Sequence, residues 1–397
     1  GPCVHPFFRY LPGMSYTETT SSGWLGRIGS SITGVLFGLV LLVVSLVMLV
    51  WNERNAVQDL KTNKEIAEKV ISVSADSVES ENEGELVHLN GPAKTDDLVK
   101  NQQFEIEENA IRLSWSAKIY QWVEKKESKK RKKLGGGEET VTTYTYKTEW
   151  VSKPVDSSKF KESGHDNGGG RKYESGSSQA KVVTLGAFKL SDELISQMSW
   201  KEPYLLQELP DSWKEDGRLS GGAFYSGIPA SPKIRDEKVS FSLTGPDEVS
   251  VMAVQTGNSF STYKSETGKT KLLLYQGLLS AEEVVEGEET KAKLQRWALR
   301  GGGIVVMFIG FLLILKPLSV LADVLPFLGN LVGGVSALVA LLLSIAISAI
   351  IIAMSWIFFR PVLGIGLLAV TIACLFFIKK KLSTKNQIST SVPPPLN

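Results

Sequence analysis

The sequence predicts a protein of the α+β class, with a four-helix transmembrane region and a large strand-rich extracytoplasmic domain inserted between spans 1 and 2. Three observations lead to this prediction. Charged side chains make up 22% of the 397 residues but are absent from four long apolar stretches. The region between the first two stretches is highly charged and alternates apolar with polar residues, as half-buried strands do. Only two cysteines occur, so that region depends on an ordinary core and not on disulfides.

The amino-terminal residues lead into the first span. Gly1-Pro2 is typical of the remnant of a protease-cleaved tag, so residues 1–13 are predicted to be a non-native extension. Residues 14–31 follow as a cytoplasmic segment, and the next apolar run predicts transmembrane helix 1 over residues 32–51. This run is longer than the apolar part of a signal peptide and lacks a small-residue cleavage site. We therefore expect a retained anchor.

The extracytoplasmic domain is predicted to extend over residues 52–297. Strict alternation from Ile111 to Ile119, and again from Val141 to Trp150, predicts two strands that pair as an antiparallel hairpin. The lysine-rich run Lys125–Lys133 lies in their connection, before three glycines. Such a run could bind anionic lipid or nucleic acid, but we favour a solvated hairpin tip because an outward location removes those usual partners.

Further elements complete this domain. A helix is predicted from Ser191 to Trp200, and Ser280 with Glu283 forms a capping box that opens a helix leading into the second span. The remaining predicted strands are Lys181–Leu190, Val239–Leu243, Val249–Thr256 and Leu272–Gln276.

Three more spans follow the domain. They are predicted over residues 302–322, 331–357 and 361–378, with a cytoplasmic tail over residues 379–397. Lys316-Pro317 interrupts the second span near its end, and Pro326 with Gly329 marks the turn before the third.

The flanking basic residues orient these spans. Arg27, Lys316 and the lysines after the fourth span lie on one side, and only Arg360 occupies the opposite short turn. Because Lys and Arg accumulate in cytoplasmic flanks, both termini are predicted to be cytoplasmic. The tryptophans at positions 51, 297 and 356 then fall at the outer interface.

Two kinds of candidate site residue lie in the spans. Gly34 with Gly38, and Gly329 with Gly333, place small residues one helical turn apart, which lets helix backbones approach closely. Packing within one chain and self-association explain these motifs equally well. The candidate membrane-boundary charges are Lys316, Asp323 and Arg360.

Residues that could carry catalysis are scarce. The three histidines, His5, His88 and His165, belong to no metalloprotease, phosphate-loop or nucleophile-elbow pattern. The region from Glu53 to Arg300 contains 36 Lys and Arg residues against 40 Asp and Glu, so it lacks the basic balance of a nucleic-acid-binding domain. We expect no enzyme activity, no cofactor, no metal and no nucleic-acid partner.

Five short motifs point to a family. They are Asn82–His88, Tyr120–Glu124, Tyr144–Trp150, Ser280–Val284 and Phe358–Pro361. In this order, with one span before the large domain and three after it, the sequence from about Trp24 to Lys381 resembles the transmembrane protein 43 family, also called LUMA. The resemblance implies a four-span protein of the endoplasmic reticulum and inner nuclear membrane in a eukaryote, or of the inner membrane in a bacterium. The outer domain contains no Asn-x-Ser/Thr sequon, which favours a bacterial periplasmic setting or a non-glycosylated one.

The resemblance also implies a role in organising membrane protein complexes. The Lys125–Lys133 run and the proline-rich tail depart from the family pattern, so the lamin and emerin partners of eukaryotic members are not carried over. We expect a non-enzymatic multi-pass scaffold that acts through its outer domain and small-residue helices and that self-associates. The alternative is a membrane sensor or carrier that binds a lipid or small ligand between the outer domain and the spans. Expected partners are membrane lipids, other membrane proteins and further copies of the chain.

Overall fold

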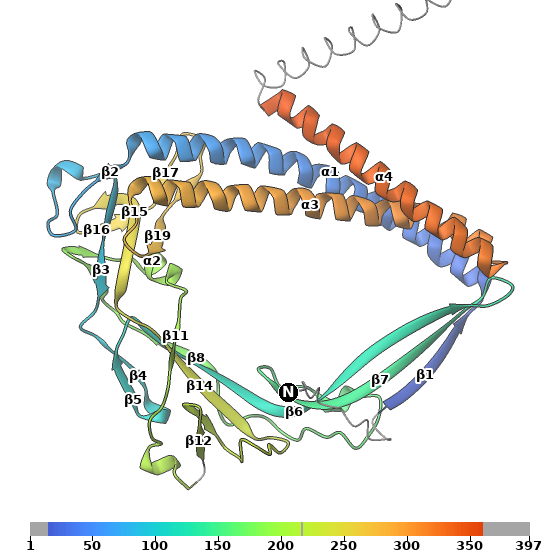
Figure 1. Cartoon of the computed structure of the whole chain (residues 1–397), viewed down its shortest axis with the longest axis horizontal. Helices are drawn as coiled ribbons and strands as arrows, with labels where there is room; N and C mark the ends of the chain where they lie inside the picture. Colours follow the sequence, from blue (N-terminus) through green and yellow to red (C-terminus); the bar gives the residue numbers. More distant parts are fainter. Residues whose placement is uncertain (1–14, 216, 360–397) are drawn as a thin grey trace, which may run out of the picture. The chain divides into compact units, whose positions relative to one another are not determined.

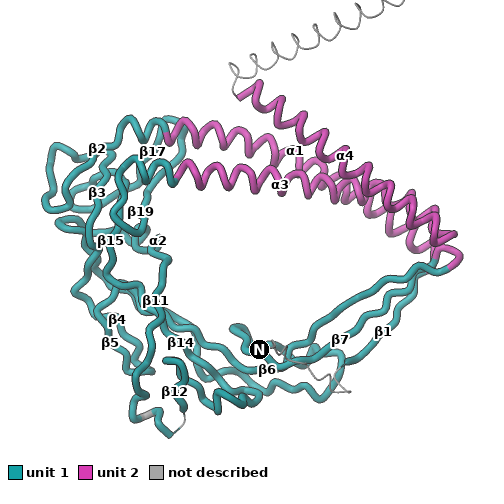
Figure 2. The backbone as a smooth tube through the Cα atoms, viewed as in Figure 1, with its two compact units in different colours: residues 1–22, 64–133, 137–287 teal, residues 23–63, 134–136, 288–397 magenta. Residues whose placement is uncertain are grey.

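The computed structural model describes residues 15–215 and 217–359, which fold into two compact units (Figure 2). Among these residues, unit 1 contains 15–22, 64–133 and 137–287, and unit 2 contains 23–63, 134–136 and 288–359. The predicted fourth span, residues 361–378, lies outside the described residues, as does Arg360.

An eight-stranded antiparallel sheet forms the larger part of unit 1 (Figure 1). Its strand order is β1-β7-β6-β14-β13-β12, with β8 paired to β6 and β11 paired to β14. The strands are β1 Ser15–Ser22, β6 Arg112–Lys132, β7 Glu138–Val151, β8 Gly176–Gln179, β11 Glu202–Tyr204, β12 Arg218–Ser220, β13 Ala223–Tyr225 and β14 Glu237–Thr244.

A seven-stranded sheet forms the second layer of unit 1. Its strand order is β10-β9-β3-β15-β16, with β19 paired to β15 and the short β2 parallel to β3. The strands are β2 Ile71–Ser72, β3 Leu86–Lys94, β9 Thr184–Leu185, β10 Phe188–Lys189, β15 Asp247–Thr256, β16 Ser259–Ser261 and β19 Leu273–Gln276. Two small hairpins join β4 Leu98–Asn101 to β5 Ile106–Asn109 and β17 Tyr263–Lys264 to β18 Thr270–Lys271.

One apolar core joins the two sheets. It combines inward-facing residues of β6 and β14 with those of β3 and β15, and includes residues of the short helix α2 Asp192–Gln197. Phe104, which is 2% exposed, lies at the centre of an aromatic group. Its ring centroid is 5.0 Å from that of Phe241, 5.2 Å from that of Phe224 and 5.5 Å from that of Trp213. Such edge and offset contacts add to the hydrophobic stabilisation of burial.

The predicted hairpin is confirmed, but it is longer than the alternation indicated. β6 pairs with β7 from Ile119 opposite Val151 to Lys132 opposite Glu138. The lysine-rich run was therefore wrongly placed in a loop: it forms the end of β6, and the turn itself is Lys133–Gly137. The run can extend as a strand because β7 supplies acidic partners, with Lys130 Nζ 2.9 Å from Glu138 Oε1 and Lys133 Nζ 2.9 Å from Glu139 Oε1.

The two helix starts that the sequence predicted, at Ser191 and at Ser280, are confirmed. Ser191 caps α2 by accepting a hydrogen bond from the backbone N–H of Leu194. The capping box is confirmed too, since Ser280 N–H donates to Glu283 Oε2 at 2.7 Å and Glu283 N–H donates to Ser280 Oγ at 3.2 Å.

Within the described residues, three helices are long and apolar enough to cross a membrane: α1 Trp24–Lys69, α3 Ala281–Ala322 and α4 Pro326–Phe359. α3 continues through Pro317 to Ala322, so the interruption predicted at Lys316-Pro317 does not break the helix. α4 begins at Pro326, earlier than the predicted start at residue 331, because proline is well suited to the first position of a helix.

Replacing Phe104 with alanine should destabilise unit 1 by about 3–5 kcal/mol, because it leaves a cavity between three aromatic rings. The matched control is Ile228→Ala, whose side chain is 60% exposed and should change the free energy of unfolding by less than about 0.5 kcal/mol. Chemical denaturation of the full chain in detergent measures both. Equal, small effects of the two variants would show that the Phe104 group is not part of the stabilising core.

Candidate functional site

A buried ion pair connects three helices of unit 2. Arg300 in α3 holds both carboxylate oxygens of Glu53 in α1, with Nε 2.7 Å from Oε1 and Nη2 2.9 Å from Oε2. Trp356 in α4 donates its indole N–H to Glu53 Oε2 at 2.8 Å. The Arg300 guanidinium also lies 4.8 Å from the ring centroid of Trp297. We call Glu53, Arg300, Trp297 and Trp356 the Arg300 clasp.

The geometry of the Arg300 clasp is that of a strong, specific contact. The side chains of Arg300 and Glu53 are only 9% and 4% exposed. A bidentate pair between guanidinium and carboxylate is charge-assisted and directional, whereas a single charge left in the same place would carry a large desolvation cost. The clasp therefore fixes the register of α1, α3 and α4 against one another.

A second ion pair lies at the other end of the same helices. Arg27 Nη2 is 2.6 Å from Asp323 Oδ2, and these side chains are 11% and 1% exposed. Trp24 donates its indole N–H to the backbone oxygen of Val320 at 2.8 Å. We call Trp24, Arg27 and Asp323 the Arg27 clasp. Along α1, Arg27 and Glu53 are about 39 Å apart at 1.5 Å per residue, which exceeds a hydrocarbon core of roughly 30 Å.

The predicted small residues lie in the seams between these helices. A Cβ at Gly38 would stand 2.7 Å from the backbone oxygen of Gly310, and Gly34 faces Leu313. A Cβ at Gly329 would stand 1.6 Å from Asp323 Oδ1, and Gly333 faces Ser319. All four glycines thus face α3 or the residues directly after it in the same chain.

Of the predicted boundary charges, the structure brings only Asp323 into a cluster. Lys316 is exposed and forms no ion pair among the described residues, and Arg360 lies outside them. The sequence reasoning missed Glu53 and Arg300, which it used only as the borders of apolar runs. A signal was present, since each of these opposite charges lies close to a tryptophan at a span end.

Titratable groups in unit 1 form no catalytic arrangement within the part of the chain that the structure describes. His88 is buried, which lowers the pKa of its ring, and its Nδ1 lies 3.4 Å from Ser72 Oγ. His165 stacks on Tyr146 with 4.0 Å between ring centroids. Burial raises the pKa of Tyr146 to about 12. No group of three His, Cys, Asp or Glu side chains that could hold a metal occurs among the described residues.

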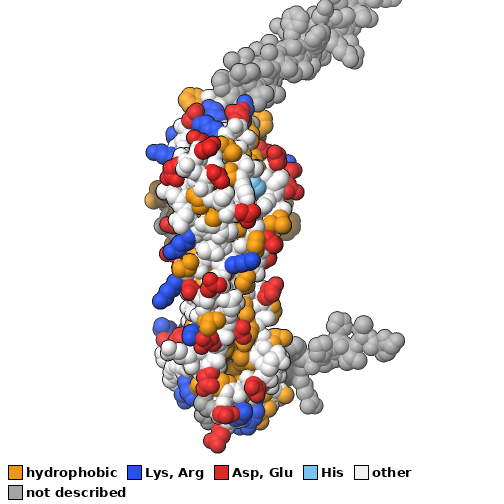
Figure 3. Space-filling model, turned by 90° about the vertical axis from the view of Figure 1, so that its left-hand side faces the viewer, with side chains coloured by type: hydrophobic (Ala, Val, Ile, Leu, Met, Phe, Trp, Pro, Cys, Tyr) orange, Lys and Arg blue, Asp and Glu red, His pale blue; other side chains and the backbone are white. Residues whose placement is uncertain are grey.

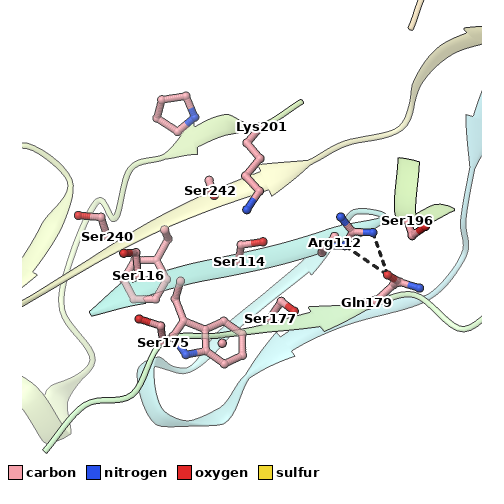
Figure 4. Close-up of a pocket in the computed structure, with 14 residues that line it drawn as sticks. Arg112, Ser114, Ser116, Ser175, Ser177, Gln179, Ser196, Lys201, Ser240 and Ser242 are labelled. Atoms are coloured by element: carbon pink, nitrogen blue, oxygen red, sulfur yellow. Dashed lines mark hydrogen bonds between the residues drawn. The ribbon is translucent and has the colours of Figure 1, made fainter. Parts of the chain in front are cut away.

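Unit 1 carries a groove of about 850 Å³ on the larger sheet, which the sequence reasoning did not predict (Figure 4). Half of its fourteen lining residues are serines. Ser114 stands opposite Ser177 of β8 on one side and Ser242 of β14 on the other, and Ser116 stands opposite Ser240. The signal lay in the sequence as alternating serines on β6 and β14.

The groove is basic. Arg112 and Lys201 line it, and no Asp or Glu does. On the face seen in Figure 3, by contrast, acidic and basic side chains are interspersed. The Arg112 guanidinium is held by neutral acceptors, namely Gln179 Oε1 and the backbone oxygens of Ile195 and Met198. Its charge is therefore not neutralised by the protein.

Two contacts bear on the predicted sidedness. β1, in the segment predicted to be cytoplasmic, pairs with β7 over Ser15–Ser22, and Arg27 Nη1 donates to the backbone oxygen of Gly136 in the hairpin turn. The sequence assigns β7 and this turn to the extracytoplasmic domain. A polar hairpin does not cross lipid. If α1 spans a bilayer with the predicted sidedness, β1 and β7 are on opposite sides and these contacts cannot form. The sidedness therefore stays a prediction.

The chain is similar to a set of curated proteins. It matches the family described as transmembrane protein 43 over residues 119–361. It is 32% identical to rat transmembrane protein 43 over 93% of this chain and 95% of the rat protein, and 32% identical to the human protein over 92% and 95%. The Drosophila melanogaster homolog is 32% identical over 89% of this chain and 94% of its own length. No solved structure matches the chain.

Removing one partner of the Arg300 clasp should strongly destabilise unit 2. We expect Glu53→Gln to lower the free energy of unfolding by about 3–5 kcal/mol, because Arg300 is left as an uncompensated buried charge. Trp356→Phe, which removes the indole N–H and part of the ring but leaves the ion pair intact, should cost less, about 1–2 kcal/mol. Unfolding in mixed detergent micelles, followed by tryptophan-independent far-UV circular dichroism, measures both.

The matched control is Lys64→Gln, which breaks an exposed pair between Lys64 and Glu68 on the same helix and should change stability little. The double variant Glu53→Gln with Arg300→Gln should lose less than the two single variants together, because neither charge remains alone. Additive losses would show that the two side chains do not interact in the membrane protein.

Proposed function

The chain belongs to the transmembrane protein 43 family, and from that premise we propose that it is a non-enzymatic multi-pass membrane scaffold that presents its strand-rich domain to protein partners. The Arg300 clasp is the observation that supports this proposal most directly. A scaffold needs a base whose geometry does not change when a partner binds. The clasp joins residues 53, 300 and 356, so it connects α1, α3 and α4 directly within unit 2.

We place partner binding on unit 1 and not on the glycine motifs. Gly34, Gly38, Gly329 and Gly333 already face α3 or its end within one chain, so they are not available as a surface for self-association. Unit 1 exposes isolated large apolar side chains, among them Leu205 at 54% and Ile228 at 60%. Partner contacts through exposed apolar residues surrounded by polar ones are typical of protein interfaces.

The proposal includes the orientation with both termini cytoplasmic. The basic residues after the predicted fourth span support it. Withdrawing α1 from lipid would expose more than ten large apolar side chains, at a cost on the order of 20 kcal/mol. The exposed β1–β7 ladder contributes a few kcal/mol at most. We therefore propose that α1 spans the bilayer and that membrane insertion separates β1 from β7.

Site-specific photo-crosslinking in native membranes tests the scaffold role. A crosslinking amino acid at Ile228 or Leu205 should capture protein partners, because these side chains stand on the domain surface. The matched control position is Leu338 in α4, which is 57% exposed and should capture lipid. Failure of both domain positions to yield any protein adduct, together with a monomeric state in detergent, would overturn the scaffold proposal.

Cysteine labelling of sealed vesicles tests the orientation. The two native cysteines, Cys3 and Cys374, are first replaced by serine, because their thiols would also react with maleimide. Thr19→Cys should then react with an impermeant maleimide only from the cytoplasmic side, and Glu208→Cys only from the opposite side. Labelling of both positions from the same side would show that β1 can stay paired with β7, and it would contradict the proposal that α1 spans the bilayer.

A further inference from the structure

We propose that the serine-lined groove of unit 1 binds a small phosphomonoester that carries free hydroxyl groups, such as a polyol phosphate. This inference does not depend on the scaffold role, because it concerns a ligand site inside one unit. The groove volume of about 850 Å³ lies within the usual range of small-molecule sites. Its lining is more polar than that of most such sites, which points to a polar ligand.

The serines form an ordered array of hydroxyl groups. Ser177, Ser114 and Ser242 make a row across three adjacent strands, and Ser116 with Ser240 makes a second row beside it. Neighbouring strands are about 4.8 Å apart, and residues two apart on a strand are separated by roughly 6.7 Å. The rows therefore place hydroxyls at the separations found between the oxygens of a small polyol phosphate.

These hydroxyl groups are available to a ligand. The side chains of Ser114, Ser116, Ser177, Ser240 and Ser242 make no hydrogen bond to any described residue. A serine hydroxyl both donates and accepts, so the array can donate to phosphate oxygens and accept from ligand hydroxyls. Figure 4 shows the labelled serines arranged around one space, with Arg112 and Gln179 at one end and Ser116 and Ser240 at the other.

The two cations set the charge of the ligand. Lys201 forms no ion pair with any described residue, and Arg112 contacts only neutral acceptors. Three contacts hold the Arg112 guanidinium in place, so its charge is fixed before a ligand arrives, while Lys201 is exposed and can adjust. A phosphomonoester carries between one and two negative charges near neutral pH. It therefore balances two cations, which a carboxylate does not.

Trp115 lines the groove, but its side chain packs against the core of unit 1. Its indole lies against β8 at Gly176, where a Cβ would stand 2.7 Å from the ring. Glycine at this position lets the ring lie close to the strand. Because successive side chains of a strand point to opposite faces of the sheet, the ring supports the floor of the groove from the core side, behind Ser114 and Ser116.

Titration calorimetry with glycerol 3-phosphate tests the proposal, using the full chain in phosphatidylcholine nanodiscs. We expect saturable binding that Lys201→Glu weakens at least about tenfold, because it replaces attraction with repulsion. Ser114→Ala with Ser242→Ala should weaken binding several-fold without changing the charge of the groove. Glycerol, which has the hydroxyls but no phosphate, should not bind measurably.

The matched control is Lys118→Glu, which makes the same charge change on β6 outside the groove. It should leave the affinity within about twofold of the unmodified protein, as expected for an exposed, screened charge. Absence of saturable binding, or equal weakening by Lys118→Glu and Lys201→Glu, would overturn the proposal. Thermal unfolding of each variant verifies that the sheet remains folded.

A second arm separates a soluble ligand from a lipid headgroup of the same chemistry. The titration is repeated in nanodiscs that also contain phosphatidylinositol 4-phosphate, whose headgroup combines a phosphomonoester with hydroxyls. If headgroups occupy the groove, the apparent affinity for glycerol 3-phosphate should fall in these discs. An unchanged affinity assigns the groove to soluble phosphate esters.

Discussion

The contact between Arg300, Glu53 and Trp356 is the constraint on which the rest of unit 2 depends. Its three members come from three helices, so it defines their mutual register in one step. Apolar side chains alone would not do this, because lipid is as apolar as leucine and helices gain little by replacing one with the other. The glycine and serine contacts along α1 and α3, such as Ser45 Oγ to the Gly303 oxygen at 2.9 Å, then follow from that register.

Local signals in the sequence predicted local structure well. Alternation located β6 and β7, and the Ser280 and Glu283 pair located the start of α3, because both signals depend on neighbours within a few residues. The extension of β6 through its lysines was not predictable in this way, since it depends on acids across the ladder. The Arg300 clasp joins residues 247 positions apart, and no periodicity in one sequence reports such a pairing. Arg360 and the predicted fourth span lie outside the described residues, so those expectations remain as they were.

The clasps of unit 2 and the groove of unit 1 differ in whether their charged side chains are paired within the protein. In the clasps, each charged side chain is paired with an opposite charge of the protein, and the pair holds helices together. In the groove, neither Arg112 nor Lys201 is paired with a described carboxylate, and five of the seven serine hydroxyls form no hydrogen bond to a described residue, so these groups can bind a ligand. Two arginines therefore have different roles. Arg300 pairs with a carboxylate and holds helices together, whereas Arg112 donates to neutral carbonyl oxygens and its charge can bind a ligand.

The long sequence separation within the Arg300 clasp has a consequence for biogenesis. Glu53 is synthesised and delivered to the membrane long before Arg300, and Trp356 follows later still. During that interval the carboxylate has no partner, and the strand-rich domain can fold while its first anchor is unpaired. The helical base is therefore completed in two steps: a nascent chain halted before α4 can pair Arg300 with Glu53 but lacks the hydrogen bond from Trp356.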